Sequence, residues 1–166
     1  MKPKIIIVNE DNQIIAHKYR SDVKTEDIYR VSALHVANSE GQVLLAQRKF
    51  TKNHDPGKWG PAVAGTVEEG ESYEDNIKKE AFEEIGLTGI EFEKWICRRN
   101  RGEHNYFSQQ FRAIVDKKIE DFTIQEEEVE QIKWFSKDEI NELFNEKPEM
   151  FINSFGNYIK LYSEEK

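Results

Sequence analysis

Three glutamates lie close together in the sequence at a spacing that matches the turn of an α-helix. Glu80, Glu83 and Glu84 stand at positions i, i+3 and i+4, which would place them within roughly 100° of one another on one helical face. Carboxylates at this spacing repel one another, so they need either free solvation or a bound cation. Hard divalent cations, Mg²⁺ above all, prefer carboxylate oxygens and keep part of their water shell for a phosphate or an attacking water. The cluster therefore indicates either a solvated charged surface or a metal site suited to phosphate chemistry.

The segment around these glutamates carries the signals of a helix with defined ends. Ser72 is a good N-cap residue, and Asp75 three positions later completes an acidic variant of the capping box. Apolar residues then recur at helical spacing until Gly86, a residue suited to end a helix. We therefore expect a helix from about Tyr73 to Ile85.

The stretch before this helix is rich in glycine and proline. From Thr51 to Gly70 these residues are too frequent for a helix, so we expect a loop-rich connection with short strands at most. Loops of this length often carry function. Basic residues near its start could hold the terminal phosphate of a diphosphate. Arg48 is the strongest candidate, whereas Lys52 could equally be a solvated loop lysine.

Loop and helix together resemble a known motif. Gly65 to Leu87 is similar to the Nudix box, G-x5-E-x7-R-E-U-x-E-E-x-G-U, where U is a bulky aliphatic residue, and seven of its nine specified positions match. Lys79 stands where the family has arginine, and Ala81 where it has a larger aliphatic residue. Lys79 keeps the positive charge about two helical turns after Glu71, so it can still pair with a loop glutamate, but without the bidentate fork of arginine.

The resemblance implies a fold and a reaction. The fold is of the α+β class, a Nudix-type α/β/α sandwich with a mixed β-sheet. The reaction is metal-dependent hydrolysis of a diphosphate linkage in a nucleoside diphosphate derivative or similar organic diphosphate, by attack of water on phosphorus. The implied cofactor is Mg²⁺ or Mn²⁺.

The same resemblance assigns expected roles to individual residues. The implied metal ligands are Glu80, Glu83, Glu84 and the backbone carbonyl of Ala64. Glu83 and Glu80 are the catalytic candidates, Glu83 either as a ligand or as the group that takes a proton from the attacking water. The expected clamp between loop and helix consists of Gly65, Glu71, Lys79 and Gly86. The substrate-binding candidates are Arg48, Lys52 and Arg99, the last because a charged hairpin could face the site.

A wider stretch, from about residue 28 to 87, is also similar to type I isopentenyl-diphosphate isomerases and their hydrolase relatives. Those isomerases have a cysteine immediately before the first glycine of the box and a histidine immediately after it, where this chain has Ala64 and Thr66. They carry a metal-binding histidine where Tyr29 stands. Because the allylic proton shift lacks these groups, hydrolysis is favoured. An isomerase-like enzyme and a non-catalytic nucleotide- or diphosphate-binding module are the alternatives.

Length and composition set broader limits. The 166 residues predict a single domain over 1–166, and the 24 basic and 32 acidic side chains give a net charge of −8, which argues against broad nucleic-acid binding. No stretch approaches the roughly 20 apolar residues of a membrane helix, so we expect no membrane association and a cytoplasmic location. The single cysteine, Cys97, excludes an internal disulfide. The expected partner is a small-molecule diphosphate, and the expected protein is a monomer or homodimer.

The remaining elements are expected around this centre. A turn-prone break predicts an N-terminal β-hairpin at about 4–18, and a second hairpin is expected from 31–37 and 43–47. Further strands are expected at 90–97, 106–115 and 130–135, followed by C-terminal helices over about 137–162. The acidic run at 126–130 is either a solvated loop or the source of another metal-directed carboxylate.

Overall fold

The structure, a computed structural model, describes residues 2–164. In chain order, the strands of this part are β1 (Lys4–Val8), β2 (Ile14–Tyr19), β3 (Ile28–Ala37), β4 (Val43–Arg48), β5 (Trp59–Pro61), β6 (Val63–Thr66), β7 (Glu93–Asn100), β8 (Asn105–Ile114) and β9 (Val129–Phe135). The helices are α1 (Tyr73–Ile85), α2 (Lys137–Glu146) and α3 (Phe155–Glu164), with short 3₁₀ turns at Arg20–Asp22, Ile119–Asp121 and Pro148–Met150.

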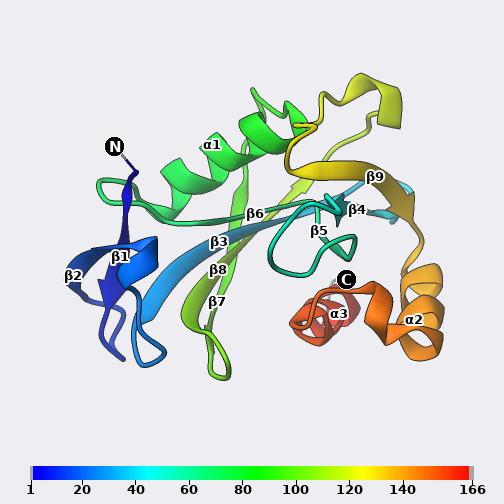
Figure 1. Ribbon diagram of the computed structural model, residues 1–166. Helices are drawn as coiled ribbons and strands as arrows, with labels where there is room; N and C mark the ends of the chain where they lie inside the picture. Colours follow the sequence, from blue (N-terminus) through cyan, green and yellow to red (C-terminus); the bar gives the residue numbers. More distant parts are fainter. Residues whose placement is uncertain (1, 165–166) are drawn as a thin grey trace.

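The elements form three layers. The strands make one mixed sheet, with α1 on one face and α2 and α3 on the other (Figure 1). This is the α/β/α sandwich of the α+β class that the sequence predicted.

Strand β3 is the centre of the sheet. It pairs antiparallel with β1 and β6 and parallel with β8, and the β8 pairing runs along its whole length, from Ile28 opposite Asn105 to Ala37 opposite Ile114. Strand β4 pairs antiparallel with β5 and β9. The parallel pair within an otherwise antiparallel sheet is what makes the sheet mixed.

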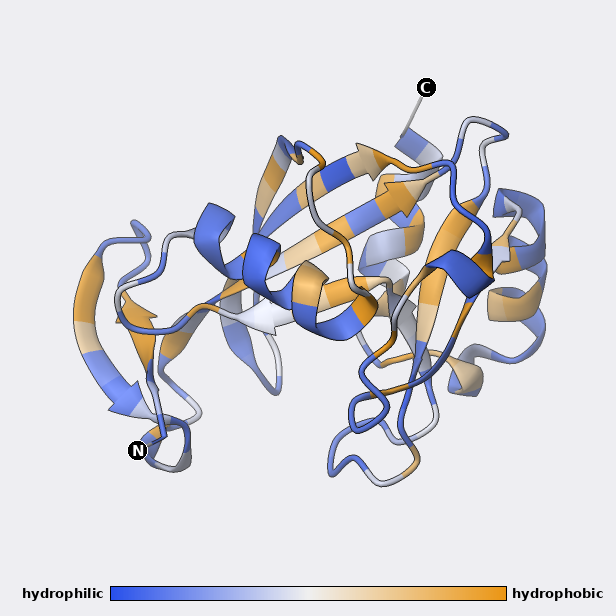
Figure 2. Ribbon diagram, turned by 90° about the horizontal axis from the view of Figure 1, so that it is seen from above, coloured by the Kyte–Doolittle hydropathy of each residue, from blue (hydrophilic) through white to orange (hydrophobic). Residues whose placement is uncertain are grey.

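Side chains that alternate along the central strands build a core on each face of the sheet. Leu34 of β3 packs with Ile77 and Ile85 of α1, whereas its neighbour Ala33 packs with Phe155 of α3. Seen from above, the outward surface of α1 is mostly hydrophilic (Figure 2). Helix α1 is therefore fixed to the sheet along one apolar stripe, with its glutamates at the edge or outside of that contact.

Several elements lie where the sequence predicted them, and one predicted hairpin is formed only in part. Helix α1 has the predicted bounds, and β1 and β2 pair as an antiparallel hairpin. The hairpin expected from 31–37 and 43–47 is formed only at its tip, where the Asn38 N–H donates to the Gln42 carbonyl and Ala37 pairs with Val43. The two strands separate since β3 is already flanked by β6 and β8, while β4 turns to β5 and β9.

None of the helices within residues 2–164 is both long and apolar enough to cross a membrane.

Candidate active site

Helix α1 has firmly defined ends, which fix the position of its glutamates. At its start Ser72 accepts a hydrogen bond from the Asp75 N–H, and the Asp75 carboxylate accepts one from the Ser72 N–H. At its end Gly86 adopts a left-handed conformation (φ 66°) and donates to the Phe82 carbonyl, as expected of a glycine C-cap. The predicted capping signals thus fix where the helix begins and ends, and its apolar stripe determines which side faces the sheet.

Glu80 lies directly on the backbone of β6. A Cβ atom added to Gly65 would be 2.5 Å from Glu80 Cγ and 2.6 Å from Cδ, closer than side chains pack. Gly65 is therefore required by the close approach of Glu80, and not by its own backbone conformation. The Glu80 side chain is 18% exposed, and burial raises its pKa to about 7.

Glu84 lies one turn further along α1 and contacts the same strand. The backbone N–H of Ala64 lies near its carboxylate and acts to lower the pKa of Glu84. Burial, reinforced by the charge of Glu80, nevertheless raises the pKa of Glu84 to about 8. Glu83 points outward and is exposed. The three glutamates are thus divided into a partly buried pair against β6 and one solvated carboxylate.

A third carboxylate comes from the acidic run before β9. The Gln125 N–H donates to the Glu84 carbonyl at 2.9 Å, which fastens this loop to the last turn of α1. Glu128 thereby lines the same cavity as Glu84, and its charge contributes to the raised pKa of Glu84. The structure therefore favours the interpretation in which the 126–130 run contributes one carboxylate, that of Glu128, to the lining of the cavity.

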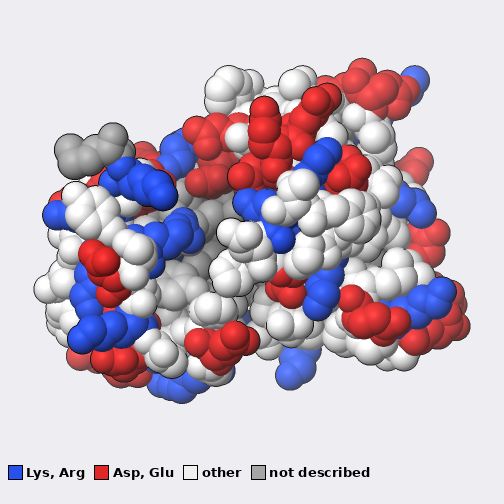
Figure 3. Space-filling model, in the orientation of Figure 1, with Lys and Arg blue, Asp and Glu red and all other residues white. Residues whose placement is uncertain are grey.

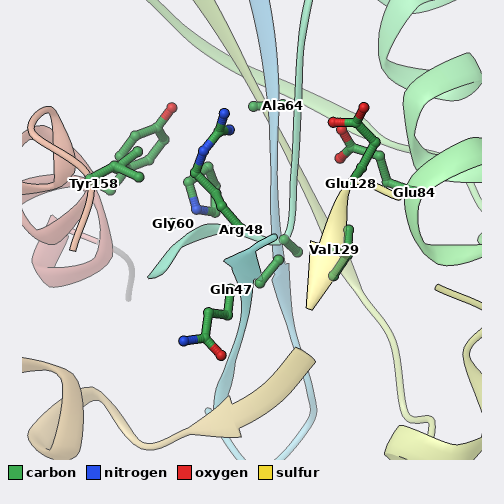
Figure 4. A pocket seen from close by; sticks show the side chains of 12 residues that line it. Gln47, Arg48, Gly60, Ala64, Glu84, Glu128, Val129 and Tyr158 are labelled. Carbon is green, nitrogen blue, oxygen red and sulfur yellow. The ribbon is translucent and has the colours of Figure 1, made fainter. Parts of the chain in front are cut away.

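Arg48 stands across this cavity from the two glutamates (Figure 4). The cavity has a volume of about 100 Å³, and Ala64, Gly60 and Tyr158 also line it. The Arg48 Nε donates to the His54 carbonyl at 2.9 Å, which orients the guanidinium group. In Figure 3 acidic side chains gather along the edge over α1, above a hollow that has basic side chains on both sides. The cavity thus has an acidic wall, formed by Glu84 and Glu128, that faces Arg48 across a small open space.

The other two substrate-binding candidates have different surroundings. Lys52 forms an ion pair with Glu128, so it lies beside the acidic wall of the cavity. Arg99 is bound to Glu10, at 3.0 Å, and to Asn105, and it lines neither this cavity nor the cleft next to it.

The prediction that Arg99 faces the site is therefore wrong. Its neighbours Arg98 and Asn100 contact α3, through Glu164 and Asn157, so alternation along β7 places Arg99 on the other face of the sheet, that of α1. There Glu10 binds it, outside the cavity that Glu84 and Arg48 line.

The clamp candidates meet around Glu71. Lys79 Nζ bonds to Glu71 at 2.5 Å and to Glu68 at 3.0 Å. Although burial acts in the opposite direction, hydrogen bonds from Lys79, the Glu68 N–H and Asn76 lower the pKa of Glu71. Glu71 is therefore an ionised structural group that ties the glycine-rich loop to α1. Gly86, the fourth clamp candidate, forms the end of the helix.

Sequence reasoning missed one residue of this clamp, Asn76. It is fully buried, donates to the Thr66 carbonyl and to Glu71, and accepts a hydrogen bond from Ser32 of β3. It therefore joins helix, loop and central strand. The available signal was a carboxamide on the apolar face of a helix, since a buried polar group must be hydrogen-bonded.

The donor set suits a hard cation. Within residues 2–164 no three His, Cys, Asp or Glu side chains are grouped so that they could hold a metal ion as they stand. Mg²⁺, however, is usually held by one or two carboxylates and keeps several waters. The partly buried carboxylates of Glu80 and Glu84 repel each other. Lys79 Nζ, 3.9 Å from Glu80 Oε1, is already bound to Glu68 and Glu71. A divalent cation would relieve this repulsion, so the residues fit such an ion.

Comparisons with known proteins agree with this geometry. The Nudix domain family model matches residues 28–154. The chain is 28% identical over 142 residues to the Nudix hydrolase YfcD of Escherichia coli K12, covering 81% of this chain and 74% of that protein. It is 31% identical to an isopentenyl-diphosphate Δ-isomerase of Kocuria rhizophila, but only over 86 residues, 51% of this chain and 48% of that enzyme.

Solved structures share the fold. DR0079 from Deinococcus radiodurans superposes with a TM-score of 0.80 at 18% identity, covering 95% of this chain and 98% of that one. A MutT protein from Methanosarcina mazei Go1 gives a TM-score of 0.66, also at 18% identity, over 82% and 93% of the two chains. The family model spans most of the sequence and its motif residues form the acidic wall of the cavity, so the chain belongs to the Nudix hydrolase family.

Proposed function

We propose that the protein is a Mg²⁺- or Mn²⁺-dependent hydrolase that cleaves a diphosphate linkage, in a nucleoside diphosphate derivative or similar organic diphosphate, by attack of water on phosphorus. The observation that carries this proposal is the cavity with Glu84 and Glu128 on one wall and Arg48 on the other. A diphosphate needs cations on its oxygens and a positioned acceptor for the proton of water. The residues around this cavity offer both.

The residues divide these tasks. The metal would be held by Glu80, Glu84, the Ala64 carbonyl and Glu128. When bound, it would neutralise the negative charge on the bridging and leaving oxygens. Arg48, oriented by its bond to the His54 carbonyl, binds phosphate oxygens from the other side.

A separate group must take the proton of the attacking water. Glu83 is exposed beside the buried pair, which suits a group that accepts this proton and returns it to solvent. Glu80 is the second candidate for this role.

The surroundings of the box give an isomerase no support. Ala64 lines the cavity at the position where the isomerases need a thiol. The thiol of Cys97 instead lies against Tyr73. Tyr29, at the position of the isomerase histidine, stacks on Tyr106 with ring centroids 5.6 Å apart.

A substrate screen tests the proposal. Nucleoside diphosphates, their sugar and alkyl esters, and isoprenyl diphosphates would be incubated with Mg²⁺ or Mn²⁺, and again with excess EDTA. We expect hydrolysis of at least one compound with metal and none with EDTA. Glu84→Gln should lower kcat/KM by at least about 100-fold. Glu69→Gln, an exposed glutamate of the same loop, is the matched control and should stay within twofold. Full activity in excess EDTA would refute the proposal.

A further inference from the structure

Glu128 already has a cationic partner within the chain. Its Oε2 is ion-paired with Nζ of Lys52, from the loop between β4 and β5. Glu128 lines the same cavity as Glu84, and the two carboxylates lie side by side in Figure 4. Arg48 faces them from the opposite wall, whereas Lys52 contacts Glu128 directly. The ammonium group is therefore bound to a carboxylate that the proposed function assigns to the metal.

The two loops stay joined without this ion pair. The Lys49 N–H donates to the Glu128 carbonyl at 3.0 Å, and the Lys52 N–H donates to the Lys49 carbonyl at 3.1 Å. Lys49 Nζ also pairs with Glu130 at 3.3 Å. These bonds hold the backbone of both loops in place. The side chain of Lys52 can therefore leave Glu128 without displacing either loop.

The pair between Lys52 and Glu128 is of the kind that opens easily. The Lys52 side chain is 27% exposed and that of Glu128 is 40% exposed, and ion pairs this accessible to water are weak. A divalent ion carries twice the charge of the ammonium group and can draw on several carboxylates of one wall. An ammonium group left in contact with the same carboxylate would repel that ion at close range. Lys52 and a divalent ion therefore compete for Glu128.

Resting on the proposed function, which assigns Glu128 to the metal, we propose that Lys52 is an exchangeable internal cation. It holds the Glu128 carboxylate at the cavity and leaves it when a divalent ion binds. Lys52 is thus a positioning residue of the metal site. The apparent metal affinity is lower than the carboxylates alone would give, because the lysine must first be displaced.

The affinity for Mn²⁺, measured by electron paramagnetic resonance without substrate, tests this exchange. Lys52→Met removes the ammonium group and keeps most of the aliphatic stem, so it should lower the Kd for Mn²⁺ about fivefold. Lys49→Met is the matched control. Lys49 lies on the same loop and is 30% exposed, and its partner Glu130 is not among the residues that line the cavity. This control should stay within about twofold of wild type.

A double variant separates competition from a general effect of charge, since removal of any nearby positive charge favours a bound cation. In the Glu128→Gln background the carboxylate for which Lys52 and Mn²⁺ compete is absent. Lys52→Met should then change the Kd by less than about twofold. A general effect of charge would persist at full size in this background.

Acetylation by acetic anhydride, followed by peptide mass spectrometry, reports on the lysine directly. In the wild type, Mg²⁺ should speed acetylation of Lys52 at least about threefold, because an ammonium group released from its carboxylate is more accessible to the reagent. The rate at Lys49 should not change. In Glu128→Gln, Lys52 should react at the faster rate with or without Mg²⁺. The wild-type measurement keeps the test decisive if a variant does not fold.

The outcomes separate the two proposals. The exchange would be overturned by an unchanged Kd in Lys52→Met, by an equal gain in Lys49→Met or in the Glu128→Gln background, or by acetylation of Lys52 that does not respond to Mg²⁺. Each of these results would count even if metal-dependent hydrolysis is found. Exchange without metal-dependent hydrolysis of any diphosphate would uphold the role of Lys52 and refute the proposed function.

Discussion

Gly65→Ala should disable the site by displacing Glu80, although the substitution adds a single methyl group. The new Cβ would lie 2.5 Å from Glu80 Cγ and 2.8 Å from Oε1, whereas ordinary contacts are 3.4 to 4 Å. Glu80 must therefore move by about 1 Å or change rotamer. Misplacement of a site group by about 1 Å costs roughly 100-fold in rate, so we expect a fall in kcat/KM of about that size.

The effect of Gly65→Ala on stability should be much smaller. Overpacking costs about 1–3 kcal/mol, and loss of the flexible glycine from the unfolded chain returns about 0.4–1 kcal/mol. We therefore expect the free energy of unfolding to fall by only about 1–2 kcal/mol, with the fold retained.

The assay combines kcat/KM on the best screened substrate, Mn²⁺ affinity by electron paramagnetic resonance, and urea denaturation. Gly156→Ala in α3 is the matched control, because its new Cβ would have only Phe144 nearby, at an ordinary 3.8 Å. It should leave activity and Mn²⁺ affinity unchanged. If Gly65→Ala stays within threefold of wild type in both kcat/KM and Mn²⁺ affinity, the position of Glu80 on β6 has no catalytic importance and our reasoning is wrong.

Three further predictions follow from the charges of the site. Lys79→Arg should be tolerated because arginine can keep the bonds to Glu71 and Glu68, whereas Lys79→Glu should weaken Mg²⁺ binding at least tenfold by calorimetry; equal affinity in both variants would contradict the clamp. Burial raises the pKa of Glu80 to about 7 and that of Glu84 to about 8. Without metal, the folded chain therefore binds more protons than the unfolded chain between about pH 4.5 and 8. Its free energy of unfolding in EDTA should therefore fall as pH rises through this window, and a flat or rising profile in urea denaturation would count against it. Glu84→Gln should make the protein more stable than wild type at pH 8 in EDTA, because it removes a buried charge, while abolishing the stabilisation that Mg²⁺ gives to the wild type; a thermal shift with Mg²⁺ equal to that of wild type would argue against Glu84 as a ligand.

Local signals in the sequence were sufficient for helix α1, whereas the fold class followed from the resemblance of the motif to the Nudix box. The Ser72 capping box and the Gly86 cap each act within a few residues of the helix end that they define, so they set these ends without help from the rest of the chain. Strand pairing is different, since it depends on contacts between distant segments. The antiparallel pairing of β3 with β6, which occupies the edge of β3 that β4 would otherwise take, has no local signature.

The site was predictable to the extent that it belongs to the motif. Glu80, Glu84 and Gly65 lie together because their spacing along one loop and one helix brings them together. Arg99 was placed wrongly because the sequence does not reveal which face of the sheet a given residue of β7 points to.

Glu128 shows the same limit for loops. A run of four acidic residues within five positions does not reveal which of them enters the site. That choice is made by the Gln125 bond to the end of α1, a contact between distant segments.

Hydrolysis in ¹⁸O-labelled water tests the central claim most directly. The substrate that the screen identifies would be turned over with Mg²⁺, and the products analysed by mass spectrometry. Attack of water on phosphorus predicts one ¹⁸O atom in a phosphate-containing product per cleavage, with no turnover in excess EDTA. Product formation with ¹⁸O only on carbon, or at an undiminished rate in EDTA, would contradict a metal-dependent attack on phosphorus at the Glu80–Glu84 site.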